Sequence, residues 1–398
     1  MESESKAPSK GEGQRGGPRR WLGPFLLFSS SLLVCVFLAE GMVRIVAPQQ
    51  LFLIRPDVYQ PVDSLGWKFR PNLSTDINTG EGTVSLFTDH RGFRIGRDGA
   101  VQSDRTVVVL GDSFMAALQV EYEDSFPGLM QSELAGLDGG PVGVRNTGVG
   151  AWDPPHYLMK IRRVLASEVP EVAVVAVYLG NDVVERGVER FEPRKPYSQP
   201  RLSIPRSVSP GAWLTSVAAP IDFQLRRISH LYVLLRSQLV ELRMRMGLSS
   251  IYFPEEYLAS EAQSSRWDTT AAILGEIAYE ASQYGVPVLF VLIPTHFQVL
   301  EEDLARHVNA FGLDTLDIRI DQPNEFLGDR LRQRGLEVLD PLPMLREAAS
   351  RGEIPYGMVD THYNEVGHRL TWEFVRDRVL EYLEGERMPS IREAPDGY

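Results

Sequence analysis

The sequence predicts an α/β fold with a five-stranded parallel sheet, preceded by one N-terminal transmembrane helix. Two observations predict the sheet: short runs of aliphatic and β-branched residues recur along the chain, and longer helical stretches separate them. Such alternation is typical of right-handed strand–helix–strand units. A third observation, a long uncharged run near the N-terminus, predicts the transmembrane helix.

The composition narrows the range of functions. The chain has 398 residues, of which 43% are hydrophobic, which suits one α/β domain with extensions, or two domains. The formal net charge of -12 disfavours nucleic-acid binding, because a protein that neutralises phosphates needs a basic face. The single cysteine, Cys35, effectively excludes a disulfide framework, a zinc ribbon and thiol catalysis.

Residues 1–46 predict a cytoplasmic leader followed by a membrane anchor. Residues 1–20 are polar and predict a disordered leader, and residues 21–46 predict a signal anchor because Trp21–Ala39 carries no charge. Five basic residues precede this run: Lys6, Lys10, Arg15, Arg19 and Arg20. The positive-inside rule then keeps the N-terminus in the cytoplasm, and the rest of the chain is expected on the extracytoplasmic side of the cytoplasmic membrane.

Two other interpretations of the apolar segment stay open. In a signal peptide cleaved after Ala39, the bulky Phe37 would stand where a small residue is preferred. Lipidation of Cys35 would require a small residue before it, and Val34 stands there instead. We therefore expect an uncleaved anchor in which Cys35 is an apolar side chain within the membrane.

Residues 47–104 predict an extended, β-containing lead-in to the main domain. Prolines punctuate this stretch, with β-like pieces at 66–69 and 83–87 and a turn at 88–94. We expect these pieces to add strands to the edge of the main sheet.

Residues 105–385 predict the main domain, with an insertion at 185–264 and a tail at 386–398. The predicted strands are Thr106–Leu110, Val142–Asn146, Val172–Tyr178, Val286–Ile293 and Leu336–Leu339. The predicted helices are Ser125–Leu137, Pro155–Ala166, Ser265–Tyr284 and Pro323–Arg334. In the insertion, His230–Met246 predicts an amphipathic helix. We interpret it as a lid or packing element and not as a second membrane segment, because Arg236, Glu241, Arg243 and Arg245 interrupt its apolar residues.

Residues with catalytic chemistry follow three of these strands, at the edge where parallel sheets bind ligands. Ser113 directly follows the first strand and is a candidate nucleophile; alternatively, it caps the next helix. Asn181 follows the third strand and is a candidate oxyanion donor, or the start of an Asx turn. After the second strand, the small residues of Thr147–Ala151 would let backbone N–H groups approach a ligand.

A histidine and a carboxylate lie before the last predicted helix, which runs to about Leu383. His362 is a candidate base, because imidazole can be neutral at working pH and accept a proton. Asp360, two positions earlier, can fix the tautomer of that imidazole. After the fourth strand, Thr295-His296 is expected either to line the cleft or to lie in a solvated loop. The candidate groups share one sheet edge and have complementary roles, so we interpret them as one active site.

In these blocks the sequence resembles the SGNH, or GDSL-like, hydrolase superfamily, and in particular its membrane-anchored polysaccharide acetyl-esterases and acetyltransferases. Gly111–Phe114 is similar to the first block of the family, Gly180–Asp182 to the third, and Asp360 and His362 to the last. The resemblance covers roughly residues 105–383. It implies a flavodoxin-like three-layer α/β/α sandwich, a Ser113 nucleophile, a His362 base and an Asp360 orienting acid, without a metal or cofactor.

The second block departs from the family pattern. The position of the usual oxyanion glycine falls on Ala151, and Gly150 stands one residue early. The family uses the backbone N–H at this place, which alanine also has. The resemblance therefore implies oxyanion donors from Ala151, or alternatively Gly150, and from Asn181. His368 matches a frequent histidine in the last helix of the family, for which a structural role is implied.

The sequence leaves three functions open. The first is a serine esterase that hydrolyses acyl esters, acetyl esters above all, for example on exported or cell-wall polysaccharide. The second is an O-acyltransferase that uses the same three residues but passes the acyl group to a sugar hydroxyl. The third is a membrane-tethered scaffold without activity, against which the complete set of Ser113, Asn181, Asp360 and His362 argues.

Overall fold

The computed structural model describes residues 19–49, 51, 55, 57–63, 65–79, 82–184, 221–222, 224–246, 254–311, 313–357 and 360–385. The predicted leader up to residue 18, much of the predicted insertion and the predicted tail at 386–398 lie outside these residues.

The described residues form one mixed sheet with the strand order β10-β9-β8-β6-β7-β5-β4-β3. Its parallel strands are β6 (Thr106–Leu110), β7 (Gly143–Asn146), β8 (Val172–Tyr178), β9 (Val288–Ile293) and β10 (Glu337–Leu339). By sequence, these five strands lie in the order 2-1-3-4-5, which is the doubly wound order of flavodoxin-like sheets. Each parallel strand lies at a position where the sequence predicts one.

The predicted five-stranded parallel sheet is only part of the observed sheet, which has eight strands and is mixed. The expectation that the lead-in adds strands to this sheet is confirmed for the piece at 83–87, but the piece at 66–69 pairs outside the sheet. The additional strands are antiparallel and come from the lead-in: β3 (Ser74–Asn78), β4 (Thr83–Thr88) and β5 (Arg94–Ile95). They are hard to recognise in the sequence because β3 is mostly exposed and β5 is only two residues long. The lead-in also forms a separate hairpin of β1 (Tyr59–Val62) and β2 (Gly66–Phe69).

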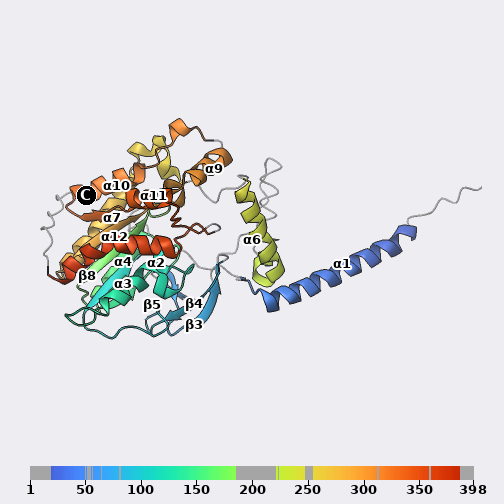
Figure 1. The fold of residues 1–398 in the computed structure, drawn as a ribbon, viewed down its shortest axis with the longest axis horizontal. Helices are drawn as coiled ribbons and strands as arrows, with labels where there is room; N and C mark the ends of the chain where they lie inside the picture. The colour runs from blue at the N-terminus through green and yellow to red at the C-terminus, as the bar shows by residue number, and fades with distance from the viewer. Residues whose placement is uncertain are drawn as a thin grey trace, which may run out of the picture.

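Helices cover both faces of the sheet, so that two apolar cores flank it (Figure 1). One core is formed with α4 (Pro154–Leu165), α7 (Arg266–Ser282) and α10 (Gln322–Gln333). The other is formed with α2 (Ser113–Ala116), α3 (Phe126–Leu134), α11 (Leu342–Ser350) and α12 (Glu365–Leu383). Successive residues of β8 alternate between the two cores, as a strand covered on both sides requires.

Some helices of the described chain have no counterpart among the predictions. They are the short α8 (His296–Val299), α9 (Glu301–Phe311) and α11 (Leu342–Ser350). The short 3-10 turns are Tyr122–Asp124, Glu255–Tyr257, Ala259–Gln263 and Thr315–Asp317. The short α8 and the longer α9 follow β9 directly.

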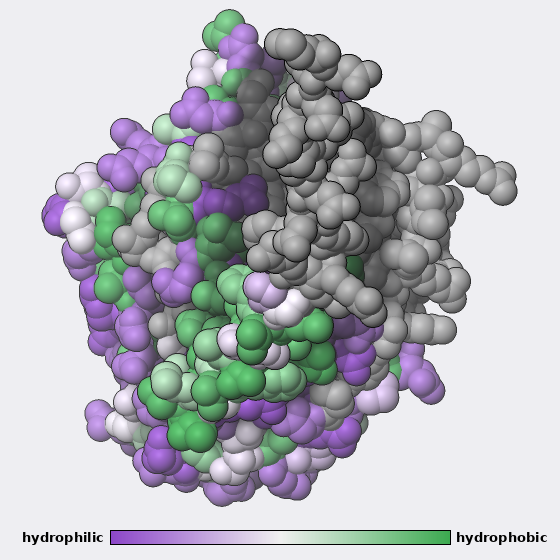
Figure 2. Space-filling model, turned by 90° about the vertical axis from the view of Figure 1, so that its right-hand side faces the viewer, coloured by the Kyte–Doolittle hydropathy of each residue, from purple (hydrophilic) through white to green (hydrophobic). Residues whose placement is uncertain are grey.

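Helix α1 (Arg19–Val46) projects away from the folded domain (Figure 1). Its segment Gly23–Val46 contains an 18-residue window with a mean hydropathy of 2.1, and no part of that window is buried. It is therefore long and apolar enough to cross a membrane or to serve as a signal sequence. Figure 2 views the molecule from the end where α1 projects, and apolar residues dominate the lower centre of that face. At its C-terminal end, α1 contacts helix α6 (His230–Arg245).

Candidate active site

The turn after β6 places Ser113 at the carboxyl edge of the sheet. Strand β6 is buried along its whole length, and Asp112 then caps helix α2 by accepting a hydrogen bond from Phe114 N at 2.9 Å. Ser113 is thus the first residue of a short helix that begins directly after a buried strand. Gly111 allows this tight turn, because a side chain there would collide with Met115.

The structure brings the predicted nucleophile and base together across 249 residues of sequence. Ser113 Oγ and His362 Nε2 lie 2.7 Å apart, a normal hydrogen-bond length. The other ring nitrogen, Nδ1, lies 3.2 Å from Asp360 Oδ1. The imidazole therefore bridges a hydroxyl and a carboxylate, which is the arrangement that lets a serine lose its proton as it attacks a carbonyl.

The loop that carries Asp360 and His362 is held in an unusual backbone conformation. Thr361 between them has a φ of 58°, in the left-handed region that β-branched residues rarely adopt. Gly357 N donates to His362 O at 2.9 Å, and Tyr356 bridges to Tyr363, so both sides of the loop are tied together. Strain of this kind persists only where the surrounding structure imposes it.

Gln119 is a site residue that sequence reasoning missed. Its side-chain amide donates to Asp360 Oδ2, on the opposite oxygen from the one that faces His362. Gln119 therefore fixes the plane of the carboxylate. No spacing or motif identifies it, because it lies in the turn after α2 and meets Asp360 only in the folded chain.

The candidate oxyanion donors follow β7 and β8, the two strands that flank β6, and each one differs in its setting. Gly150 packs so close to the nucleophile that a side chain there would begin 3.8 Å from Ser113 Cβ. Ala151, which is exposed, has a φ of 62°. Asn181 is also exposed, and its Nδ2 lies 3.3 Å from Asp112 Oδ2. The three residues predicted from the sequence thus lie on the two turns that flank the end of β6.

Charge and burial work against each other at the imidazole. Burial lowers the pKa of His362, but the charge of Asp360 and its hydrogen bonds outweigh this effect, so the pKa is raised overall. For Asp360, burial raises the pKa, and the opposite charge of His362 and the hydrogen bonds lower it more. Burial raises the pKa of Asp112, which is 1% exposed.

The raised pKa of His362 leads to a prediction about pH. A general base must be neutral, so ester turnover is expected to fall as the pH drops through the pKa of His362. Because this pKa is raised, the acid limb of kcat/KM should have its midpoint above the usual histidine value of about 6.5. A pH–rate profile of kcat/KM measures the midpoint. A midpoint clearly below the usual value would contradict the electrostatic balance described for His362.

The lead-in, which lies outside the main domain, forms hydrogen bonds with the turn at Gly150. Trp67 of β2 donates its indole N–H to Gly150 O at 3.1 Å, and Trp152 returns a hydrogen bond to Trp67 O, also at 3.1 Å. The ring of His156 stacks on Trp152. The β1–β2 hairpin therefore fixes the backbone at Gly150, beside the proposed nucleophile.

The lead-in also holds the helix that begins at Ser113. Arg94 of β5 is fully buried, and its guanidinium donates to three carbonyls at and just after the end of α2, those of Ala116, Ala117 and Val120. Burial lowers the pKa of Arg94 to about 10, so the group stays charged at neutral pH. An arginine that satisfies three carbonyls at a helix end fixes that end firmly. Neither Arg94 nor Trp67 carries a sequence motif that predicts this position.

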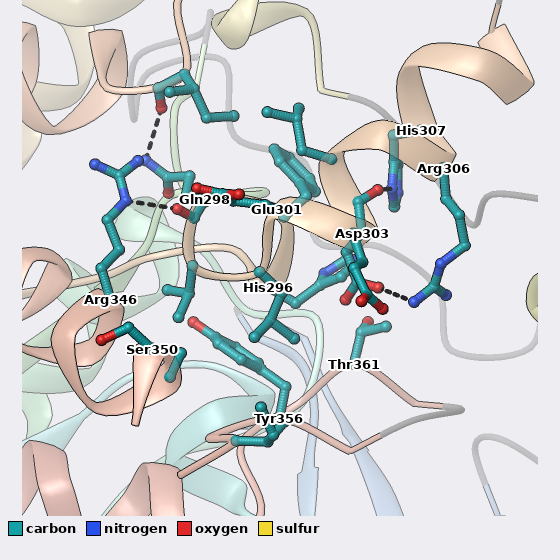
Figure 3. Close-up of a pocket in the computed structure, with 18 of the residues that line it drawn as sticks. His296, Gln298, Glu301, Asp303, Arg306, His307, Arg346, Ser350, Tyr356 and Thr361 are labelled. Atoms are coloured by element: carbon teal, nitrogen blue, oxygen red, sulfur yellow. Dashed lines mark hydrogen bonds and ion pairs between the residues drawn. The ribbon is translucent and has the colours of Figure 1, made fainter. Parts of the chain in front are cut away.

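A cavity of about 850 Å³ adjoins the Asp360–His362 loop (Figure 3). His296, Tyr356 and Thr361 line it, and Asp303 pairs with Arg306 at one side. Burial and the nearby cations lower the pKa of His296 to about 3, so the ring is neutral at working pH. Of the two outcomes expected for Thr295-His296, the structure gives a buried turn, with His296 lining this cavity.

His368 does not join Ser113. It is buried in α12, where its ring meets the edge of Tyr363 with ring centroids 5.6 Å apart. Burial and the nearby charge of Arg94 lower its pKa to about 3. This setting agrees with a packing role for His368.

No protein-family model and no curated protein sequence matches the chain. Among solved structures, a member of the lipolytic protein G-D-S-L family from Veillonella parvula is similar at 15% identity, over 69% of this chain and 97% of that one, with a TM-score of 0.36. An acetyl xylan esterase shares 12% identity over 69% of this chain and 99% of its own, with a TM-score of 0.39. A catalytic mutant of an acetylxylan esterase from Geobacillus stearothermophilus shares 11% identity over 73% of this chain and 99% of its own, with a TM-score of 0.35.

Proposed function

We propose that the protein is a serine esterase of the SGNH type, in which Ser113 is the nucleophile, His362 the general base and Asp360 the orienting carboxylate. The observation that carries this proposal is the hydrogen-bonded chain from Ser113 Oγ through the imidazole to the Asp360 carboxylate. The sequence supports the proposal independently, because these residue types occur in the same order as in the blocks of the family that the sequence resembles.

The proposed reaction has two steps. His362 Nε2 takes the proton from Ser113 Oγ while Oγ bonds to the acyl carbon, and the carbonyl oxygen becomes an oxyanion. The imidazolium then gives this proton to the departing alkoxide, which leaves as an alcohol. In the second step His362 takes a proton from water, which attacks the acyl-enzyme, and the proton passes back to Ser113 as the carboxylic acid is released.

The proposed oxyanion donors are backbone N–H groups of Ser113 and Ala151 and the side-chain amide of Asn181. Donors fixed before the reaction stabilise the charge that appears on the carbonyl oxygen, at about 3–4 kcal/mol for a single donor. Two hydrogen bonds from the lead-in support this role. Trp67 holds the turn at Gly150, and Arg94 holds the end of the helix that begins at Ser113. Gly150 N–H is the alternative to that of Ala151.

We also propose that α1 anchors the enzyme in the cytoplasmic membrane, with the catalytic domain on the outer side. The exposed, apolar surface of α1 supports anchoring, and the basic leader supports the orientation. The proposed substrates are acyl esters on the extracytoplasmic side, among them acetylated exported or cell-wall polysaccharide.

The proposal predicts ester turnover by the full-length protein in detergent. We expect release of both nitrophenol and acetate from p-nitrophenyl acetate, and covalent labelling by a fluorophosphonate probe. Adding a neutral oligosaccharide such as cellotetraose tests whether a sugar hydroxyl replaces water. Hydrolysis predicts that acetate equals nitrophenol in amount, whereas acetylated oligosaccharide in place of acetate would show an O-acyltransferase. Neither turnover nor labelling would favour a scaffold without activity.

A further inference from the structure

Helix α6 carries an apolar stripe that no described residue covers. Leu235, Leu239, Leu242 and Met246 are between 52% and 60% exposed. Their spacing of four and three residues places the three leucines on one side of the helix, and Met246 follows directly after its end. Four large apolar side chains in a row, all open to solvent, are unusual on a protein surface and point to a binding partner.

The N-terminus of α6 is bound to the end of α1. Glu40 of α1 accepts hydrogen bonds from the backbone N–H groups of His230 and Leu231, each at 2.9 Å, and from Ser229 Oγ at 2.7 Å. A carboxylate at this place satisfies N–H groups that a helix start leaves open, and it complements the positive end of the helix dipole.

Two further bonds join the same segments. Arg44 pairs with Glu40 and donates to Ile228 O at 2.6 Å, and Gln49 N donates to His230 Nδ1 at 2.8 Å. The start of α6 is therefore attached at three points to residues 40–49. In Figure 1, α6 rises steeply from the C-terminal end of α1, on the side of the folded domain.

We propose that α6 is an interfacial helix whose Leu235, Leu239, Leu242 and Met246 lie in the outer surface of the same membrane that α1 spans. This inference rests on the proposed anchoring of α1. Where α1 crosses the bilayer, its charged end at Glu40 and Arg44 lies at the headgroup level. A helix bound at that level and directed across α1 runs along the membrane surface, which is the position of amphipathic interfacial helices.

The attachment of α6 to the membrane helix points to lipid as the partner. The exposed apolar side chains of α1 continue to Ile45 and Val46, and residues 44 and 49 hold the start of α6, so the bilayer that covers α1 lies beside the stripe. Arginines flank the stripe: Arg243 is exposed, and Arg236 pairs with Asp222. Such side chains place their stems along lipid and their charges among headgroups. The sequence predicts a lid or packing element at this helix, and the experiment below distinguishes contact with protein from contact with lipid.

Site-directed fluorescence in membranes tests the proposal. Cys35 is the single cysteine, so an environment-sensitive NBD probe on it reports α1 in the otherwise unchanged protein. In a Cys35→Ser background, Leu239→Cys reports the stripe, and Leu316→Cys is the matched control because Leu316 is 85% exposed on the folded domain. The full-length variants are reconstituted in vesicles of phosphatidylcholine and phosphatidylglycerol that contain spin-labelled lipids, with the label either near the headgroup or deep in the acyl chain.

At position 239 we expect a blue shift of the probe's emission, and quenching that is strongest with the headgroup-level label. At position 35 we expect quenching that is strongest with the deep label. Position 316 should show an aqueous spectrum without lipid quenching. If position 35 is quenched and position 239 behaves like 316, the interfacial helix is refuted while the anchor stands. Protection of position 239 from aqueous iodide without lipid quenching would also refute it, since the stripe is then covered by protein. If position 35 is not quenched, the anchoring itself fails.

Discussion

Ser113→Ala is expected to abolish ester turnover while the protein stays folded. Removing the nucleophile of a serine hydrolase lowers kcat on the order of 10⁶-fold, because the covalent step is lost. The fold should survive, since Asp112 rather than Ser113 caps α2, and the lost hydroxyl is only partly buried. Initial rates with p-nitrophenyl acetate measure the effect, and circular dichroism with thermal unfolding checks the fold.

Ser282→Ala is the matched control for this prediction. Ser282 ends α7 on the surface, where its hydroxyl donates to Tyr279 O and accepts a long hydrogen bond from the neighbouring Gln283 side chain. Turnover by the control should equal that of the unchanged enzyme. Turnover by Ser113→Ala within tenfold of the unchanged enzyme would remove Ser113 from the mechanism, as would fluorophosphonate labelling of that variant.

Asp360→Asn is expected to lower kcat about 10⁴-fold with little change in structure, as the same change does in other serine hydrolases. The carboxylate accepts the Nδ1–H of His362, which leaves Nε2 free to accept the proton of Ser113. An amide in its place favours the other tautomer, in which Nε2 carries a proton and cannot act as a base. Gln119 adds to the effect, because its side-chain N–H favours the oxygen of the new amide on its own side. The NH2 group of that amide then faces His362.

The pH profile separates this orienting role from a merely structural one. The charge of Asp360 raises the pKa of His362, so the acid limb of the variant should move to lower pH. Asp377→Asn provides the control, since Asp377 is on α12 with its side chain 83% exposed. A rate loss of less than tenfold, or an acid limb that does not move, would show that Asp360 does not govern the imidazole.

The sequence predicted those parts of the site that depend on residue type and position along the chain. Ser113 and Asn181 were identifiable because each follows a run of buried strand residues, where the edge of a parallel sheet must lie. Asp360 and His362 were identifiable because their chemistry completes that of a serine. Their distance from Ser113 could not be read from the sequence, because it depends on how α12 packs against the sheet.

The supporting residues escaped prediction for a physical reason. The supporting contacts join residues that are far apart in the sequence and meet only in the folded chain, namely those of Arg94, Trp67 and Gln119. None of the three residues belongs to a recognisable sequence motif. Arginine is an exposed residue type on average, so nothing marked Arg94 as fully buried. The lead-in strands β3 and β5 were missed similarly, because exposure or shortness removes the alternation of apolar residues by which strands are recognised.

The short connection between α1 and β1 limits where the proposed enzyme can work. Helix α1 ends at Val46 and β1 begins at Tyr59, so residues 47–58 form the whole tether. Even fully extended, a tether of this length spans only about 40 Å. The hairpin at its far end binds Gly150, so the catalytic edge moves with it. On the proposed anchoring, the enzyme serves newly emerging polymer close to the lipid surface, and esters deeper in the cell envelope stay beyond its reach.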